Sequence, residues 1–164
     1  MTIILYARNV AGNRFFPHAM GDTIPPGVCN NTALRKATRS VTRFYDAHLA
    51  RTGLRSTQYA ILSLLANRGS ATMAELAAAL CMDRATMGHN LRPLERDGLL
   101  TIRIGQHDRR ARDVALTAQG AALEKQGRAA WRTAQAGFEA AFGAQDAQAM
   151  RQLMARIVDL DLPV

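Results

Sequence analysis

The sequence predicts a predominantly α-helical domain that contains one small β-hairpin. Apolar residues recur at helical spacing over most of residues 30–160, and strict alternation appears only around residues 100–116. The composition agrees, because alanine, leucine and arginine are abundant while only 5% of the residues are aromatic. A chain of 164 residues is long enough for one domain with its own core and too short to expect two.

Four helices are expected before the alternating region, at about residues 30–53, 56–69, 72–80 and 83–98. Ser56 is a favourable N-cap residue for the second of them. Thr72 and Glu75 have the spacing of a capping box, which opens the short third helix. Asp83 is expected to cap the fourth helix, and Gly98 is the residue at which it ends.

Two strands and two more helices follow. Apolar and polar residues alternate over residues 100–104 and again at 114–116, with a polar, basic stretch between them, which predicts a hairpin. Thr117 is expected to cap a long helix, and the last helix begins at about residue 145. Residues 1–27 are rich in Gly and Pro and show no sustained period, so we expect a loosely ordered N-terminal arm there.

This order of elements predicts a winged helix-turn-helix lobe over about residues 54–117. Helices at about residues 30–50 and 118–162 flank the lobe and carry more apolar surface than so small a core can cover. A second copy of the same helices is the simplest partner for that surface. We therefore expect residues 28–164 to form a single domain whose N- and C-terminal helices join two copies into a homodimer.

The net charge of +8 suits an anionic polymer or a membrane surface, and the distribution of charge decides between them. Seven arginines and three acids lie between Arg84 and Arg112, on the fourth helix and the hairpin. Such a helix in the major groove, with the hairpin in the neighbouring minor groove, predicts double-stranded DNA as the partner. No run reaches the roughly 18–20 apolar residues that span a bilayer. The start lacks the pattern of a signal peptide, so we expect a cytoplasmic protein without membrane contact.

The residues predicted to contact DNA fall into three groups. The fourth helix supplies Arg84, Thr86, His89, Asn90 and Arg92, of which Arg92 lies further along and is the candidate for a phosphate contact. Thr72 is the candidate for a DNA backbone contact outside this helix. The hairpin supplies Asp108, Arg109, Arg110 and Arg112, and a carboxylate at 108 can orient Arg110 for a narrow minor groove. The alternative is a solvated helix face beside a turn held by a surface ion pair.

Several of these segments together resemble the MarR family of bacterial transcriptional regulators. The segments are Thr72-Met-Ala-Glu-Leu-Ala, Leu91-Arg-Pro-Leu-Glu-Arg-Asp-Gly-Leu-Leu, Asp108-Arg-Arg and Val114-Ala-Leu-Thr-Ala-Gln-Gly. The resemblance implies a triangular homodimer on a pseudo-palindromic operator. It also implies wing roles for Asp108 and Arg110. Many such regulators repress genes until a small phenolic or other aromatic acid, or an oxidant, loosens them from DNA.

Two hypotheses concern what the protein senses. A small aromatic acid could be held between the flanking helices and the lobe, and the candidate residues for it are Arg35, Arg39, Arg43 and His48. The alternative is that the three arginines are simply solvated and that the histidine has a structural role. Cys29 stands just before the first helix, whose N-terminus can lower a thiol pKa, so Cys29 is a candidate redox sensor. The alternative is that it is a small residue near the helix cap without a sensing role. Cys81 lies between Leu80 and Met82 and is expected to pack in the core, and both cysteines are expected to be reduced thiols.

Catalysis is not expected. The four histidines have no metal-ligand partner at helical spacing, and no nucleophile elbow, phosphate loop or dinucleotide fingerprint occurs. The sequence therefore predicts neither a metal nor a cofactor. A winged helix that contacts another protein is the remaining alternative, although such a module would not need arginines on this helix and hairpin.

Overall fold

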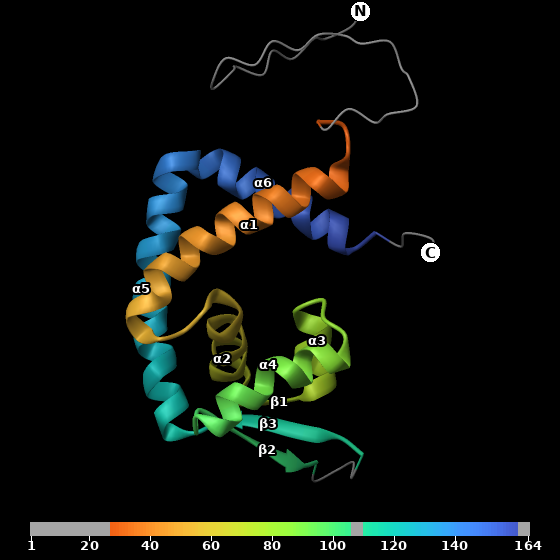
Figure 1. The fold of residues 1–164 in the computed structure, drawn as a ribbon, viewed down its shortest axis with the longest axis vertical. Helices are drawn as coiled ribbons and strands as arrows, with labels where there is room; N and C mark the ends of the chain where they lie inside the picture. The colour runs from red at the N-terminus through yellow and green to blue at the C-terminus, as the bar shows by residue number, and fades with distance from the viewer. Residues whose placement is uncertain (1–26, 106–109, 161–164) are drawn as a thin grey trace, which may run out of the picture. The chain divides into compact units, whose positions relative to one another are not determined.

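The computed structural model describes residues 27–105 and 110–160. Asp108, Arg109 and all but the last residue of the arm expected over residues 1–27 lie outside the described residues. The elements in order are α1 (Asn30–Leu49), a short 3-10 turn (Ala50–Thr52), α2 (Ser56–Arg68), β1 (Ser70–Thr72), α3 (Met73–Ala79), α4 (Arg84–Arg96), β2 (Leu100–Ile104), β3 (Arg112–Leu116), α5 (Ala118–Phe142) and α6 (Ala144–Val158) (Figure 1). The chain divides after Thr38 into two units, and the core and cavities described below lie in the second.

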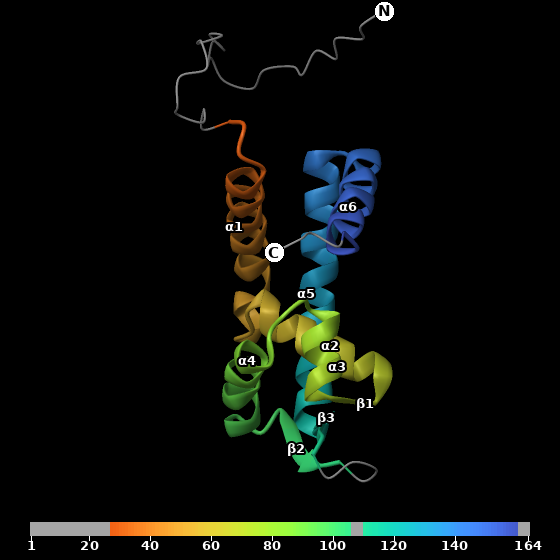
Figure 2. The same cartoon turned by 90° about the vertical axis from the view of Figure 1, so that its right-hand side faces the viewer.

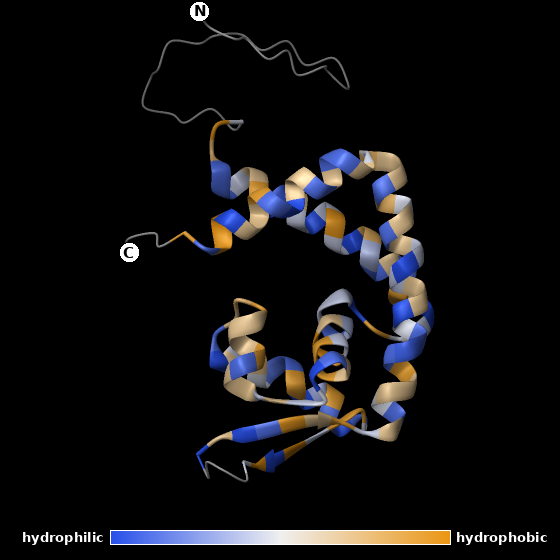
Figure 3. Cartoon of the chain, turned by 180° about the vertical axis from the view of Figure 1, so that it is seen from behind, coloured by the Kyte–Doolittle hydropathy of each residue, from blue (hydrophilic) through white to orange (hydrophobic). Residues whose placement is uncertain are grey.

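The three strands form one antiparallel sheet in the order β1-β3-β2. Val114 pairs with Ile102 on one side and with Ala71 on the other, so the hairpin expected from the alternation is confirmed. β3 changes from hydrophobic near α5 to hydrophilic toward the hairpin tip (Figure 3). The sequence did not predict β1, because three residues are too few to show a period.

The core lies between α2, α3, α4 and the inner face of the sheet. Its fully buried side chains are those of Leu49, Ile61, Leu62, Leu65, Leu76, Met87, Leu91, Leu94, Leu100 and Val114. They come from the end of α1, from α2, α3 and α4, and from β2 and β3, which is the arrangement of a winged helix-turn-helix. The predominantly helical fold with a small sheet is thus confirmed (Figures 1 and 2).

Three of the expected caps are present. Thr72 Oγ1 accepts a hydrogen bond from the Glu75 N–H at 3.2 Å, and the Glu75 carboxylate accepts the Thr72 N–H at 2.6 Å. Asp83 accepts the Thr86 N–H at 2.7 Å at the start of α4. Thr117 accepts the Gly120 N–H at 3.0 Å at the start of α5. Each cap satisfies backbone donors that the first turn of a helix leaves unpaired.

The expected cap of α2 was wrong by one residue. Ser56 is the first helical residue, and Arg55, in an extended conformation, holds the N-cap position. The Ser56 N–H donates to Asp46 Oδ1 of α1 at 2.7 Å, and the Arg55 N–H donates to Gln58 Oε1 at 2.9 Å. A carboxylate from a different helix therefore accepts one of the N–H groups that the first turn of α2 leaves unpaired.

Cys81 does not pack in the core, contrary to expectation. It is exposed and has a left-handed φ of 51°. Its N–H donates to Ala78 O at 3.2 Å, and the next N–H, of Met82, donates to Ala77 O at 2.8 Å. These are the two hydrogen bonds of a Schellman motif, in which the left-handed position turns its side chain away from the helix. Gly98 holds the same position after α4, with a φ of 70°.

Candidate nucleic-acid interface and aromatic cavity

α4 presents one face to the core and another to solvent. Met87, Leu91 and Leu94 are fully buried and fix the helix on the lobe. Arg84, Thr86, His89 and Arg92 are exposed, as are Arg103, Arg110 and Arg112 of the hairpin. The exposed face is therefore polar and basic, and the core contacts that hold it are entirely apolar.

Two of the predicted contact residues on α4 already have partners. The Thr86 hydroxyl donates to Asp83 Oδ2 at 2.7 Å, within the cap of the helix. The Asn90 amide donates to the Thr86 backbone oxygen at 2.8 Å and is half-buried. His89 and Arg92 carry no such hydrogen bond within the part of the chain that the structure describes. The sequence could not anticipate this difference, since it depends on which rotamer each side chain adopts.

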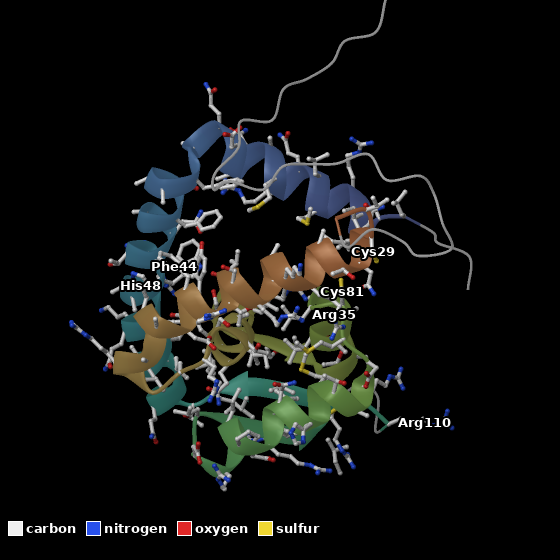
Figure 4. All side chains as sticks on the ribbon, turned by 45° about the horizontal axis from the view of Figure 1, so that its top comes forward. Cys29, Arg35, Phe44, His48, Cys81 and Arg110 are labelled. Atoms are coloured by element: carbon white, nitrogen blue, oxygen red, sulfur yellow. The ribbon has the colours of Figure 1, made fainter. Side chains whose placement is uncertain are left out.

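A cleft of about 460 Å³ brings together predicted residues from separate elements. Thr72 lies at the start of α3 and Arg84 at the start of α4. Arg112 begins β3, and Arg110 lies two residues before it. The remaining lining residues are Met73, Ala74 and Ala111, so no acidic side chain lines it among the described residues. Figure 4 shows Arg110 at the outer end of the hairpin. Three guanidinium groups around one cleft form a favourable binding site for a phosphate group.

The acidic residues close to this surface are engaged at helix caps. Hydrogen bonds from the backbone and hydroxyl of Thr72 lower the pKa of Glu75. Hydrogen bonds from the backbone and hydroxyl of Thr86 likewise lower the pKa of Asp83. Both carboxylates are ionised at neutral pH and fix the first turns of α3 and α4. Their role is local, because it keeps the N-terminal turn of each helix in place beside the basic cleft.

A second cavity, of about 520 Å³, lies between α1, α2 and α5. Its aromatic walls are Tyr45, Tyr59 and Trp131, and the rings of Tyr59 and Trp131 stack with centroids 6.4 Å apart and an interplanar angle of 26°. Ser56, Ser63 and Asn67 add polar groups from α2. Burial raises the pKa values of Tyr45 and Tyr59, so both hydroxyls keep their protons at neutral pH.

Two arginines on successive turns of α5 complete this cavity. Arg128 binds Glu124 through two hydrogen bonds, of 3.1 and 2.7 Å, and Glu124 is 2% exposed. Arg132 also lines the cavity and makes no ion pair or hydrogen bond with any described residue. Among these three side chains one carboxylate faces two guanidinium groups, which leaves a positive charge at the cavity wall.

The four residues predicted for an effector pocket do not line this cavity. Arg39 and Arg43 are exposed on α1, and Arg35 belongs to the first unit of the chain. The His48 ring lies 4.6 Å from the Phe44 ring, with Nδ1 2.9 Å from the Phe44 backbone oxygen (Figure 4). The sequence signal that could have found the cavity is the Arg-x-x-Trp-Arg spacing at 128–132, which places the three side chains on one side of α5.

Comparison with known proteins decides the family. A family model described as "MarR family" matches residues 54–111. The transcriptional regulator MosR of M. tuberculosis, solved in complex with DNA, is 33% identical, with a TM-score of 0.72 over 79% of this chain and 93% of that chain. The chain belongs to the MarR family. No curated protein sequence matches it.

Other MarR-like folds are more distant in sequence. NadR, solved in complex with 4-hydroxyphenylacetate, is 22% identical with a TM-score of 0.68 over 85% of this chain and 99% of that chain. CouR from Rhodococcus jostii, bound to p-coumaroyl-CoA, is 19% identical with a TM-score of 0.71 over 87% of this chain and all of that one (100%). At these identities the likeness shows the fold alone.

The family model matches only part of this MarR-family transcriptional regulator. Residues 54–111 include α4 and the outgoing strand of the hairpin, but not α5 with its cavity arginines. The structural neighbours are transcriptional regulators rather than enzymes. No described helix is long and apolar enough to cross a membrane. The described residues also contain no group of His, Cys, Asp and Glu side chains that could hold a metal ion.

Cys29 lies in the first unit of the chain, directly before α1. Its backbone oxygen accepts the Ala33 N–H at 3.0 Å, so it stands at the beginning of the helix, as the sequence indicated. Hydrogen bonds with the side chain and backbone of Thr32 lower the pKa of the Cys29 thiol. The side chain is half-buried. A thiolate is the form that oxidants attack, and a lowered pKa increases the thiolate fraction at neutral pH.

Proposed function

We propose that this MarR-family regulator is a dimeric repressor that binds a pseudo-palindromic operator and leaves it when a small aromatic acid binds. α4 enters the major groove with Arg84, His89 and Arg92 at its surface, and Arg110 enters the adjacent minor groove. The observation that carries the DNA-binding part is the basic cleft between Thr72, Arg84, Arg110 and Arg112. A relative at 33% identity was solved in complex with DNA, which supports the same partner here.

The test of this interface is a gel-shift titration against the DNA that flanks the gene. Arg110→Ala should weaken specific binding at least tenfold, since it removes a minor-groove contact, while the dimer stays intact. Lys125→Ala is the matched control, because it removes one positive charge from the exposed surface of α5. Equal effects of the two substitutions would contradict the wing assignment. Equal competition by a random duplex would instead favour a nonspecific binder or a protein-contact module.

The apolar face of α6 and the end of α5 supports a homodimer. Leu153 is 51% exposed, Phe142 48% and Ile157 39%, which is unusual for large apolar side chains in one region of a monomer. A second copy of the same helices would cover them, as the symmetry of most homo-oligomers allows. Sedimentation at several protein concentrations measures this directly. A monomer at micromolar concentration would contradict the proposed dimer.

The cavity between α1, α2 and α5 supports an aromatic acid as the effector. A planar ring can lie against the Tyr59 and Trp131 pair, while Arg132 offers a guanidinium group that has no carboxylate of its own among the described residues. Trp131 is the single tryptophan of the chain, so the fluorescence signal comes from the wall of this cavity. With 4-hydroxyphenylacetate as the probe, Arg132→Ala should weaken binding at least tenfold and Lys125→Ala should not change it.

Redox sensing through Cys29 is a second candidate, favoured by the lowered pKa of its thiol. Hydrogen peroxide should then release the protein from its operator, and Cys29→Ser should abolish that response. Cys81→Ser is the matched control, because Cys81 is the other cysteine and is exposed. Loss of the response in the Cys81 variant, but not in the Cys29 variant, would assign the sensing to the turn between α3 and α4.

A further inference from the structure

A continuous line of side-chain hydrogen bonds connects α1, α5 and α6. The Tyr45 hydroxyl donates to Gln135 Oε1 at 2.7 Å. Gln135 Nε2 in turn donates to Glu139 Oε1 at 2.7 Å. Arg151 Nη1 of α6 donates to the same Glu139 oxygen at 3.0 Å. We call these four side chains the relay.

The two ends of the relay lie at different features of the protein. Tyr45 lines the aromatic cavity between α1, α2 and α5. Arg151 belongs to α6, the helix whose large apolar side chains are exposed. Near the relay, at the end of α5, the Phe138 and Phe142 rings stack on each other with centroids 5.4 Å apart, so the surroundings of Glu139 on this helix are largely apolar. The relay is thus the polar connection between the cavity and α6 that the described residues contain.

The chemistry of Tyr45 makes this connection sensitive to what fills the cavity. A phenol has one O–H, so its proton can go to Gln135 or to an acceptor in the cavity, but not to both. A carboxylate is the stronger acceptor, because a charge-assisted hydrogen bond is stronger than one to a neutral amide. When Tyr45 donates to a bound acid, Gln135 Oε1 loses its donor and the Gln135 amide is no longer held with its NH₂ toward Glu139.

We propose that Tyr45, Gln135, Glu139 and Arg151 are positioning residues that connect occupancy of the cavity to the placement of α6, and through the dimer to operator binding. The inference rests on the proposed function, in that the cavity is the effector site and α6 joins the two copies. With the cavity empty, the relay holds α6 against α5 in the arrangement that fits the operator. A bound acid accepts the Tyr45 O–H hydrogen bond in place of Gln135, and this weakens the hold of Gln135 on Glu139 and Arg151. The coupling expected for such a device is about 5- to 150-fold in operator affinity.

The test removes either end of the relay and measures operator affinity without any ligand. Tyr45→Phe keeps the ring and removes the O–H, and Arg151→Gln removes the guanidinium at the other end. Each should weaken operator binding about fivefold or more without dissociating the dimer. The double variant should be no weaker than the weaker single variant, because both changes break one connection. Thr133→Ala is the control, since its hydroxyl, on the same helix α5, bonds only its own backbone at Ala129.

Adding 4-hydroxyphenylacetate separates this inference from the proposed function. It should lower the operator affinity of the wild type and of Thr133→Ala, and it should leave Tyr45→Phe nearly unchanged. If the acid changes nothing in the wild type, 4-hydroxyphenylacetate is refuted as an effector, and the ligand-free measurements still decide the relay. Operator affinities of both single variants within twofold of wild type, or losses that multiply in the double variant, would overturn the relay.

Discussion

α5 contains three glycines whose surroundings differ. We therefore expect substitution by alanine to change the free energy of unfolding differently at each of them. A Cβ added at Gly120 would overlap the backbone oxygen of Leu99, which already accepts the Thr117 N–H at 3.1 Å. A Cβ at Gly127 would lie 2.8 Å from the Tyr59 ring, which is a side chain in the cavity wall. At Gly137 the nearest atom would be Phe44 Cζ, at an ordinary contact distance of 3.5 Å.

Gly120→Ala should destabilise the protein by about 1–3 kcal/mol. Overpacking costs about 1–3 kcal/mol, and the displaced helix start loses the Thr117–Leu99 hydrogen bond, worth about 1 kcal/mol. The gain in helix propensity from glycine to alanine is about 1 kcal/mol and offsets only part of this. At Gly137 nothing opposes that gain, so Gly137→Ala should stabilise by about 0.5–1 kcal/mol. Gly127→Ala should fall between them, because the Tyr59 ring can move and a backbone oxygen cannot.

Urea unfolding followed by circular dichroism gives the free energy of unfolding for the three variants. All samples need one protein concentration, because the stability of a dimer depends on it. The slope of free energy against urea should stay unchanged, so that the midpoint reports stability alone. A Gly120→Ala variant as stable as the wild type would refute the close approach of α5 to Leu99. Destabilisation of similar size at Gly120 and Gly137 would refute the prediction that the space around each added Cβ decides the effect.

Further expectations concern the turns, the caps and the DNA contact. Cys81→Gly should raise the free energy of unfolding by about 1 kcal/mol, because glycine takes a left-handed φ without strain, and Cys81→Ala should bring no such gain. Thr72→Ala should lower it by about 1 kcal/mol through loss of the α3 cap, and an unchanged urea midpoint would contradict this. The pKa of Glu75 is lowered from 4.5 in the folded state, so its stabilisation is present above about pH 4.5 and disappears as the pH falls through the folded-state value. Glu75→Gln should therefore show a smaller loss of stability in acid, as thermal unfolding at several pH values would reveal. Arg92→Ala should reduce the slope of log affinity against log salt by about one if Arg92 contacts a phosphate, and an unchanged slope would exclude that contact.

Much of the fold was predictable because its signals are local. Thr72 with Glu75, Asp83 and Thr117 cap helices through hydrogen bonds to residues three positions further on, and such spacing is visible in any sequence. The hairpin follows from alternation, and the basic residues of α4 and the hairpin follow from composition. The cleft then assembles Thr72, Arg84 and the hairpin arginines that the sequence had already singled out.

Other features depend on residues that are distant in the chain. Ser56 is the first residue of α2 and not its cap, and its N–H is satisfied by Asp46, ten positions earlier. The ring of Tyr59 meets Trp131 only because Gly127 lets α2 and α5 approach closely. Cys81 faces solvent because two backbone hydrogen bonds set a left-handed turn, which its apolar neighbours Leu80 and Met82 did not reveal.

The sequence by itself determined the helices, the hairpin, the family resemblance and the basic surface, because period, capping and charge act over a few residues. Only the tertiary structure decided where the cavity lies and that Arg128, Trp131 and Arg132 line it in place of His48 and the arginines of α1. It also decided that Tyr45 reaches Gln135, 90 positions away. Such contacts depend on how close two helices pack and on which rotamers that distance permits, and neither quantity is written in the spacing of residues along the chain.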